Sequence, residues 1–196
     1  MNFQLLVETF KPGQSQSGVK FLAAHDRQKN AGRWVTEFGT LDQVLSLYET
    51  PEGHPAPLFP TETSGYAQAN PRNILRRDVL PLRAVKEYQP GSDKLFELRE
   101  YSLLPGTAAE FAAHMLAAMP VRERHSANVG IWLPLSGDAD RIFHMWSYRD
   151  LAHRAEVRAA VGKEAGWQAY LEAVMPLLRQ MNSTLLTPAP STAPAA

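Results

Sequence analysis

The sequence predicts an α+β fold in which two tandem ferredoxin-like halves form a barrel-type pseudo-dimer within one chain. The first observation is an internal repeat: residues 3–12 (FQLLVETFKP) align with residues 96–105 (FELREYSLLP), and glycine follows each segment. The second is that residues 32–34 (GRW) align with residues 130–132 (GIW). The third is the element order predicted for the second copy, which is strand, helix, strand, strand, helix and a short last strand.

The second copy predicts its elements from spacing and turn residues. Residues 107–124 carry Phe111, Met115 and Met119 at helical spacing without an internal glycine, which favours an amphipathic helix. Ser-Gly-Asp at 136–138 predicts the turn of a hairpin. The elements expected around that turn are strands at 129–135 and 141–148, helices at 151–161 and 167–178, and a last strand at 184–187.

The first copy follows the repeat as far as Tyr48 and then departs from it. Residues 51–71 contain five prolines, which exclude a continuous helix, and this loop is interpreted as a lid over a cavity mouth. After this loop, only residues 73–85 could be helical. The expected domains are a first, eroded half at 1–90, a second, well-preserved half at 91–188 and a disordered tail at 189–196.

Charge and composition exclude several classes of partner. Twenty basic and twenty acidic side chains give no net charge, so neither nucleic acid nor an anionic membrane is expected as a partner. The chain has no cysteine, which excludes disulfides and cysteine-ligated zinc. No segment approaches the roughly 18 apolar residues of a membrane span, and no signal peptide pattern is seen. A cytoplasmic protein without membrane insertion is therefore expected.

Several words of the second copy occur in the order of a known family. They are FELREYSLLPG (96–106), GIW (130–132), IFHMWSYRDLAHRAEVRAA (142–160), WQAY (167–170) and LLTPAP (185–190). These words resemble a NIPSNAP domain over nearly all of residues 95–190. Residues 36–44 (TEFGTLDQV) resemble the matching hairpin of the family's N-terminal half.

This resemblance implies a dimeric α+β barrel fold, similar to that of small enzymes of which some are cofactor-free monooxygenases and others degrade haem. It implies no single reaction. It also implies an arginine pair after the hairpin, which is present as Arg154 and Arg158 and has no counterpart in the first copy. Any site is therefore expected to be lopsided.

Strand alternation sorts the side chains into two faces. In the hairpin strand, Phe143 and Met145 are assigned to the helices, and the opposite face is assigned to the interior of a barrel in which each sheet covers the other. The side chains expected in that interior are Gln4, Leu6, Glu8, Trp34, Thr36, Val44, Ser46, Tyr48, Glu97, Arg99, Tyr101, Trp132, Pro134, Ile142, His144 and Trp146. The predicted cavity is aromatic with a few ionisable groups.

The predicted catalytic residues are His144, Glu97, Tyr101 and Arg99, because a histidine that titrates near neutral pH beside a carboxylate and a phenol suits acid–base chemistry. The alternatives are a hydrogen-bonded core histidine and a structural Glu97–Arg99 ion pair. The predicted substrate-binding residues are Trp34, Tyr48, Trp132, Trp146 and Phe59. No metal site is expected, and Arg122 is interpreted as solvated surface.

Three function classes follow. The first is an enzyme without a redox cofactor, a lyase or isomerase that opens or rearranges a small hydrophobic substrate by proton transfer. The second is a cofactor-free or haem-linked monooxygenase, which rests on analogy of fold. The third is a binding or scaffold protein without chemistry. The expected partner is a small hydrophobic molecule with no cofactor, and the outer helical faces are compatible with a homo-oligomer.

Overall fold

The computed structural model describes residues 1–24, 29–50 and 73–190, which form two compact units. The first unit comprises Met1–Leu82 and Leu186–Ala196, and the second comprises Arg83–Leu185. The predicted lid at 51–71, which includes Phe59, lies outside the described residues, as does most of the predicted tail. Each unit is described by itself below.

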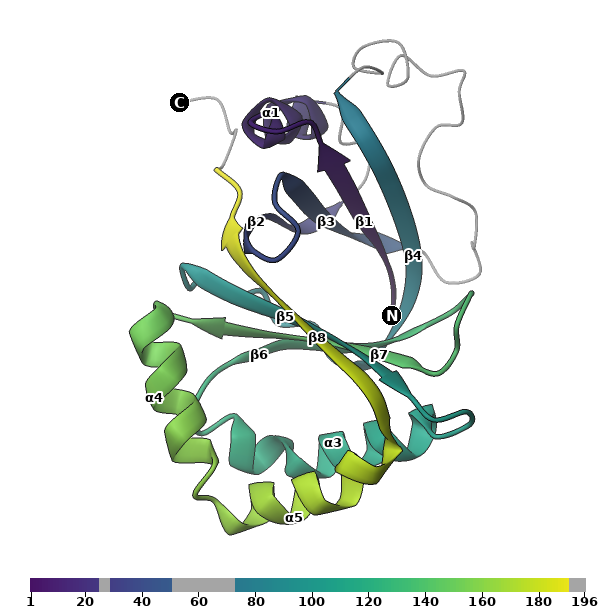
Figure 1. Cartoon of the computed structure of the whole chain (residues 1–196), viewed down its shortest axis with the longest axis vertical. Coiled ribbons are helices and arrows are strands. Elements are labelled where there is room, and N and C mark those ends of the chain that lie inside the picture. Colours follow the sequence, from purple (N-terminus) through teal and green to yellow (C-terminus); the bar gives the residue numbers. More distant parts are fainter. Residues whose placement is uncertain (25–28, 51–72, 191–196) are drawn as a thin grey trace. The chain divides into compact units, whose positions relative to one another are not determined.

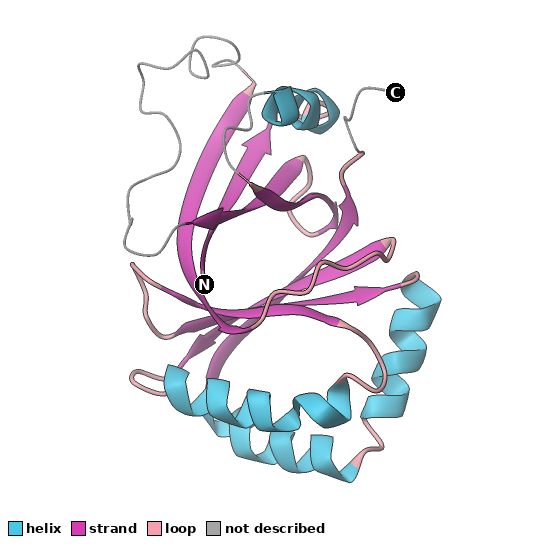
Figure 2. Ribbon diagram, turned by 180° about the vertical axis from the view of Figure 1, so that it is seen from behind, coloured by secondary structure: helices cyan, strands magenta, loops and turns pink. Residues whose placement is uncertain are grey.

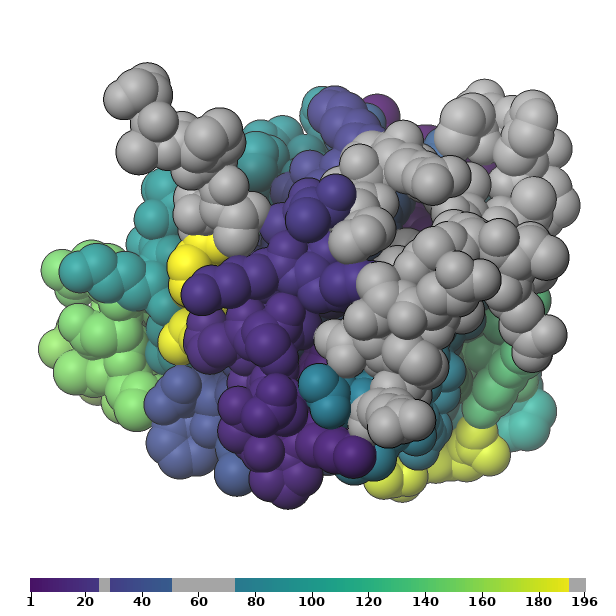
Figure 3. Space-filling model, turned by 90° about the horizontal axis from the view of Figure 1, so that it is seen from above, coloured from purple at the N-terminus to yellow at the C-terminus, as the bar shows by residue number. Residues whose placement is uncertain are grey.

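The first unit is a ferredoxin-like half with one described helix. Its elements are β1 (Asn2–Phe10), α1 (Ser15–Ala24), β2 (Asn30–Phe38), β3 (Gln43–Thr50) and the first part of β4 (Ile74–Lys86). Hydrogen-bonded neighbours follow the order β4-β1-β3-β2, and β3 runs antiparallel to both β1 and β2. Val19 and Leu22 of α1 are buried, whereas Lys20 is exposed. The N-terminal part of this unit, in purple, lies on the face of the molecule that Figure 3 shows.

The second unit repeats this topology with a full set of helices. Its elements are β5 (Leu95–Leu103), α3 (Ala108–Arg122), β6 (Asn128–Pro134), β7 (Arg141–Tyr148), α4 (Leu151–Val161), α5 (Ala165–Val174), η1 (Met175–Leu177) and β8 (Leu178–Pro188). Hydrogen-bonded neighbours follow the order β8-β5-β7-β6, the same relation of strands as in the first unit. The three α-helices cover one face of this sheet (Figures 1 and 2).

Matching turns show that the two units are copies of one design. In the first unit, the Asp42 carboxylate accepts a hydrogen bond from the Gly13 amide at 3.0 Å. In the second, the Asp140 carboxylate accepts one from the Gly106 amide at 2.7 Å. Both glycines have positive φ, 76° and 82°, a conformation that glycine adopts without steric cost. The aligned Gly and Asp positions of the sequence repeat therefore correspond to one structural device used twice.

A second shared device lies in the β2 and β6 strands. The Trp34 ring packs over Gly32 and the Trp132 ring over Gly130, so closely that a Cβ atom at either glycine would lie 2.3 Å from the ring. A β-bulge occurs at the same place in both strands, just before each glycine. The glycine of the aligned Gly-x-Trp words is thus required because the ring occupies the space of a side chain.

The interpretation of residues 73–85 as a possible helix is wrong, because this segment forms the strand β4. Its exposure does not follow a helical period, and Ile74, Val79 and Val85 are β-branched residues that favour strands. The segment fills the fourth strand position of the first half. The predicted final strand is correct in place but short, since β8 starts directly after the 3-10 turn that contains Pro176.

The predicted faces of β5 and β7 are inverted. The Tyr101 ring lies 4.8 Å from the His144 ring and 6.0 Å from the ring of Phe111, which belongs to α3. The predicted interior residues that lie on the helix face of this unit are Glu97, Arg99, Tyr101, Ile142, His144 and Trp146. Phe143 and Met145 therefore occupy the other face. Strand alternation groups the side chains by face but does not say which group points to the helices, because both faces of β7 are apolar.

The same inversion holds for β1 and β3. Leu6, Val44 and Tyr48 form one buried cluster with Val19 and Leu22 of α1. The predicted interior residues that lie on the helix face of this unit are Gln4, Leu6, Glu8, Val44, Ser46 and Tyr48. By contrast, Trp34 and Trp132 face away from the helices of their own units, since their cross-strand partners are Leu45 and Phe143.

Candidate functional site

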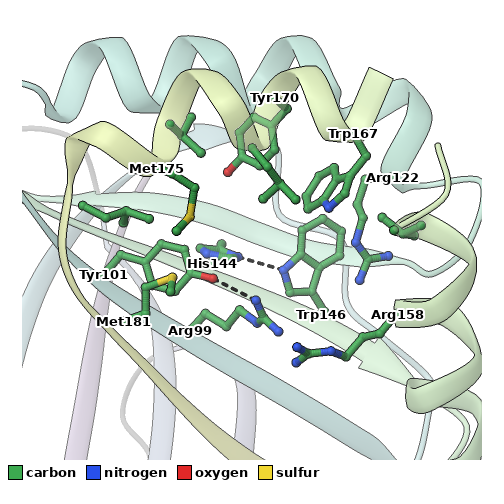
Figure 4. Close-up of a pocket in the computed structure, with 15 residues that line it drawn as sticks. Arg99, Tyr101, Arg122, His144, Trp146, Arg158, Trp167, Tyr170, Met175 and Met181 are labelled. Atoms are coloured by element: carbon green, nitrogen blue, oxygen red, sulfur yellow. Dashed lines mark hydrogen bonds between the residues drawn. The ribbon is translucent and has the colours of Figure 1, made fainter. Parts of the chain in front are cut away.

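The second unit contains a cavity of about 250 Å³ between the helix face of its sheet and the helices (Figure 4). Sheet residues form its floor, helical residues form its roof, and the start of β8 closes one side. The lining residues are Arg99, Tyr101, Arg122, His144, Trp146, Arg158, Val161, Gly162, Trp167, Tyr170, Leu171, Val174, Met175, Leu178 and Met181. The cavity thus combines aromatic and aliphatic surface with three arginines.

Strand alternation places the polar groups of the floor. Arg99 and Tyr101 are two residues apart in β5, and His144 and Trp146 are two residues apart in the neighbouring strand β7. The two strands pair antiparallel with Arg99 opposite His144, so all four side chains share one face. The pairing of these two neighbouring antiparallel strands therefore fixes the relative positions of the four side chains.

Glu97 anchors the network beneath the cavity. Its side chain is fully buried and accepts hydrogen bonds from Arg99 at 3.0 Å, Arg154 at 2.7 Å, Ser183 at 2.6 Å and Tyr148 at 3.2 Å. Burial alone would raise the pKa of Glu97, but the Arg154 hydrogen bond and the Arg99 charge outweigh it and lower the pKa to about 2. The group is therefore a permanent carboxylate that positions Arg99 and is too weak a base to take a proton from carbon.

Arg99 in turn orients Tyr101. One Nη of Arg99 donates to the Tyr101 hydroxyl oxygen at 2.8 Å (Figure 4). Burial opposes the charge of Arg99, but the neighbouring Tyr101 and Glu97 raise its pKa, so the guanidinium stays charged. Because the Tyr101 oxygen accepts this bond, its own O–H is left to donate to another acceptor. The cavity is where such an acceptor can sit.

His144 is held as a neutral hydrogen-bond donor. Its Nδ1 accepts a hydrogen bond of 2.7 Å from the Trp146 indole N–H, which places the ring proton on Nε2 (Figure 4). Burial and then the Arg99 charge lower the pKa of His144 well below its ordinary value. Among the described residues, no atom pairs with His144 Nε2, although the side chain is 3% exposed. A buried donor of this kind needs an acceptor from a bound molecule.

Arg122 brings a second buried positive charge to the cavity. It is 5% exposed, donates to Ser126 at 2.5 Å and to Tyr148 at 3.0 Å, and lies 4.1 Å above the Trp146 ring. Burial lowers its pKa, although the Tyr148 hydroxyl partly opposes this effect. In the described part of the chain, no carboxylate forms an ion pair with Arg122. The groups in contact with its charge are the Trp146 ring and the hydroxyls of Ser126 and Tyr148, and the Glu97 carboxylate acts on it from a greater distance.

The chemistry available at the site follows from these groups. None of the lining residues is acidic, and the one buried carboxylate beneath them is shared by Arg99 and Arg154. His144 Nε2–H and Tyr101 O–H are both donors on the same face of the sheet, and their ring centroids lie 4.8 Å apart. Donors of this kind polarise a carbonyl group or stabilise an oxyanion when they bind its oxygen atom. Over residues 1–24, 29–50 and 73–190, no group of three His, Asp or Glu side chains could hold a metal ion.

The cavity unites part of the predicted site. His144, Tyr101, Arg99 and Trp146 line it, and Glu97 lies directly behind Arg99. The other predicted substrate-binding residues are elsewhere: Trp34 and Tyr48 belong to the first unit, Trp132 is on the opposite face of the second sheet, and Phe59 lies outside the described residues.

Sequence reasoning missed the residues that the helices contribute. Arg122 was expected on the surface but is buried, and Trp167 and Tyr170 of α5 complete the roof. The helical spacing contained the signal for Arg122, because Phe111, Met115 and Arg122 fall on one helix face and all are buried. A polar residue on an apolar helix face is informative in itself.

Comparison with known proteins gives a family. A family model described as NIPSNAP matches residues 96–192, which include the whole cavity. NipSnap homolog 1 of Danio rerio is 30% identical over 168 residues, which cover 80% of this chain and 60% of that protein. The chain therefore spans about 60% of the length of the curated relatives that it matches most strongly.

Solved structures match the fold of the whole chain. A structure described as a putative monooxygenase from Lactobacillus acidophilus NCFM has a TM-score of 0.68 at 10% identity, covering 96% of this chain and 94% of that one. An anthrone oxidase-like protein has a TM-score of 0.68 at 9% identity, covering 100% and 96%. At these identities the likeness concerns the fold. It confirms the predicted class, tandem ferredoxin-like halves of the dimeric α+β barrel type.

None of the described helices is long and apolar enough to cross a membrane.

Proposed function

The chain belongs to the NIPSNAP family through its second half, and we propose that this half is a small-molecule enzyme that needs no redox cofactor. The proposed chemistry is proton transfer next to a carbonyl group, of the lyase or isomerase type. The observation that carries the proposal is the pair of donors in the cavity, Tyr101 O–H and His144 Nε2–H, of which the second is buried without an acceptor. Such donors strengthen as negative charge develops on a substrate oxygen.

Each group has a definite role in this scheme. The substrate oxygen accepts hydrogen bonds from His144 Nε2 and Tyr101, and Tyr101 transfers its proton to that oxygen as the carbonyl becomes an enol. The resulting phenolate, held by Arg99, takes the proton from the adjacent carbon, so that protons and electrons balance within the substrate and Tyr101. Glu97 positions Arg99 and does not touch the substrate. Bond cleavage or isomerisation can then start from the enol.

This assignment differs from a simple histidine base. A base must offer a free lone pair, and the Nδ1 lone pair of His144 is already used by the Trp146 N–H at 2.7 Å. Its pKa, lowered well below the ordinary value by burial, also makes it a weak base. A neutral imidazole is still an effective donor to a developing oxyanion. His144 is therefore proposed as an electrophilic catalyst and Tyr101 as the proton carrier.

Exchange of carbon-bound protons in D₂O tests the proposal. The substrates are benzylacetone, a neutral ketone, and benzylpyruvate, a keto acid, followed by NMR. The protein is expected to exchange the protons next to the carbonyl of at least one of them, and Tyr101→Phe should slow this exchange by roughly 10²- to 10⁴-fold. Tyr88→Phe is the matched control, because Tyr88 contacts the Trp132 ring and does not line the cavity. Exchange at the buffer rate, or full activity in Tyr101→Phe, contradicts the proposal.

A cofactor-free monooxygenase is the second candidate, favoured by the likeness of fold to structures described as a putative monooxygenase and an anthrone oxidase-like protein. The haem-linked form of that activity does not fit this cavity. Its volume of about 250 Å³ is below the roughly 300–1,000 Å³ of pockets that hold drug-sized ligands, and the haem macrocycle is at least as large as such ligands. Oxygen consumption during the exchange assay identifies the monooxygenase, and binding without exchange or oxygen uptake identifies a non-enzymatic binding protein.

A further inference from the structure

We infer that the cavity of the second unit recognises a carboxylate-bearing substrate with an apolar body, whose carboxylate binds between Arg122 and Arg158. This inference rests on the proposed function in treating the cavity as a substrate site, and it adds the chemical class of the substrate. A compound of this class carries its reacting carbonyl at the floor, its carboxylate at the arginines and its apolar part at the mouth.

The charges around the cavity call for an anion. Arg99, Arg122 and Arg158 line it, and Arg154 lies just behind, whereas within the described part of the chain Glu97 is the one carboxylate bonded to any of them. Glu97 is fully engaged with Arg99 and Arg154, so it leaves the charges of Arg122 and Arg158 without an acidic partner in the described residues. Arg122 is buried, and a buried cation is costly unless an opposite charge accompanies it, whereas Arg158 is exposed and adds its charge at the edge of the cavity. A bound anion supplies that charge.

Arg122 is preorganised to bind a planar anion. Its Cζ atom lies 4.1 Å from the centroid of the Trp146 ring, and hydroxyls of Ser126 and Tyr148 accept from two of its nitrogen atoms. A guanidinium has five N–H groups, so donors remain after these two bonds. Arg158 reaches the cavity from the exposed side of α4 (Figure 4). The planar guanidinium matches a carboxylate, which can accept two parallel hydrogen bonds.

The side chains at the rim of the cavity favour a ligand with an apolar body. Leu171, Met175 and Met181 line the cavity although they are 37%, 51% and 53% exposed, which is high for such side chains. Methionine adapts to ligands of varied shape, and Tyr170 and Trp167 extend the apolar surface inward. The cavity volume of about 250 Å³ admits a compound smaller than a typical drug, such as an aryl or alkyl keto acid.

Calorimetric titration with unreactive probes tests the inference. Phenylbutanoate, the neutral phenylbutanol and inorganic phosphate are compared on the full-length protein at neutral pH. Phenylbutanoate is expected to bind at least tenfold more tightly than phenylbutanol, because the two share their apolar body and differ in the carboxylate. Arg158→Gln should remove most of that preference. Equal affinity for the two, no binding of phenylbutanoate, or displacement of it by millimolar phosphate overturns the inference.

Two further variants separate a binding role from loss of fold. Arg179→Gln removes an exposed arginine of β8 that pairs with Asp138, and it should leave the preference unchanged. Arg122→Lys keeps the charge but loses the planar fork, and it should weaken phenylbutanoate binding more than phenylbutanol binding. Binding is measured without turnover, so carboxylate binding in the absence of proton exchange sinks the proposed function and leaves this inference standing. Exchange of benzylacetone without a carboxylate preference does the reverse.

Discussion

Glu97 is the centre of a buried hydrogen-bond network in the second unit. It collects hydrogen bonds from two arginines, a serine and a tyrosine that come from β5, α4, β8 and β7. Each of these partners lies on a different element, so one carboxylate fixes where four elements meet. A buried charge of this kind stabilises the fold when it is fully paired and destabilises it when a partner is removed.

Glu97→Gln is therefore expected to lower the free energy of unfolding by about 3 kcal/mol at pH 7. The pKa of Glu97 is depressed to about 2 from 4.5, so its carboxylate contributes stability above the unfolded pKa, and the contribution is lost as pH falls from about 4.5 toward 2. Urea unfolding at pH 7, 4 and 2.5 should show the difference between wild type and variant shrinking with acid. Glu172→Gln, on the exposed face of α5, is the control. A variant as stable as wild type at pH 7 contradicts this role.

His144 shows what the sequence could not reveal at this scale. A histidine beside a tyrosine and a carboxylate in the pattern of β5 and β7 predicts a titrating base. The structure gives the opposite electronic state, because Trp146, two residues along the same strand, donates to Nδ1. That bond depends on side-chain rotation rather than on spacing, and spacing is all that the sequence offers. Residue type identified the site, and geometry determined its chemistry.

At the scale of elements, the two aligned Gly-x-Trp segments could be recognised in the sequence, but the structural reason for their glycine could not. The alignment of residues 32–34 with 130–132 predicted equivalent strands, and the structure shows equivalent bulges with a tryptophan over each glycine. Trp132 is 2% exposed, so its ring has no free space into which it can retreat.

Gly130→Ala is expected to destabilise the second half by about 1–3 kcal/mol, because the new methyl group would lie 2.3 Å from the Trp132 ring. Denaturant unfolding followed by near-UV circular dichroism measures both the stability and the displacement of the ring. The double variant with Trp132→Leu tests the cause, since alanine at 130 should cost little once the ring is gone. An equal cost in both backgrounds would mean that the backbone of the bulge, and not the ring, requires glycine.

The faces of the strands and the conformation of β4 both depend on contacts between segments that are distant in the sequence. Strands that are apolar on both faces give a two-residue period without a direction, so Phe143 and His144 were separable but their faces were not assignable. In the segment 73–85, the sequence allowed a helix, but the segment forms β4 because it fills the fourth strand position of the first half. Pairing between distant segments overrides local propensity.

At the scale of the whole molecule, the repeat predicts two similar halves, and the candidate site is a feature in which they differ. Both halves keep the strand order, the aspartate turns and the Gly-x-Trp bulges. Arg154 and Arg158 follow β7 in the second half, and the sequence has no counterpart to them after β3. The lopsided site expected from this difference corresponds to the cavity under α4 and α5.

The central claim is that the second half binds its substrate on the helix face of its sheet. The chain has six methionines, and three of them mark the competing locations: Met175 and Met181 line the cavity, whereas Met145 lies on the opposite face of β7. Methyl NMR of protein labelled at methionine, titrated with phenylbutanoate, reads all three at once. The account predicts that the Met175 and Met181 signals shift with a common affinity while Met145 stays in place. A shift of Met145 with Met175 and Met181 unmoved would contradict it.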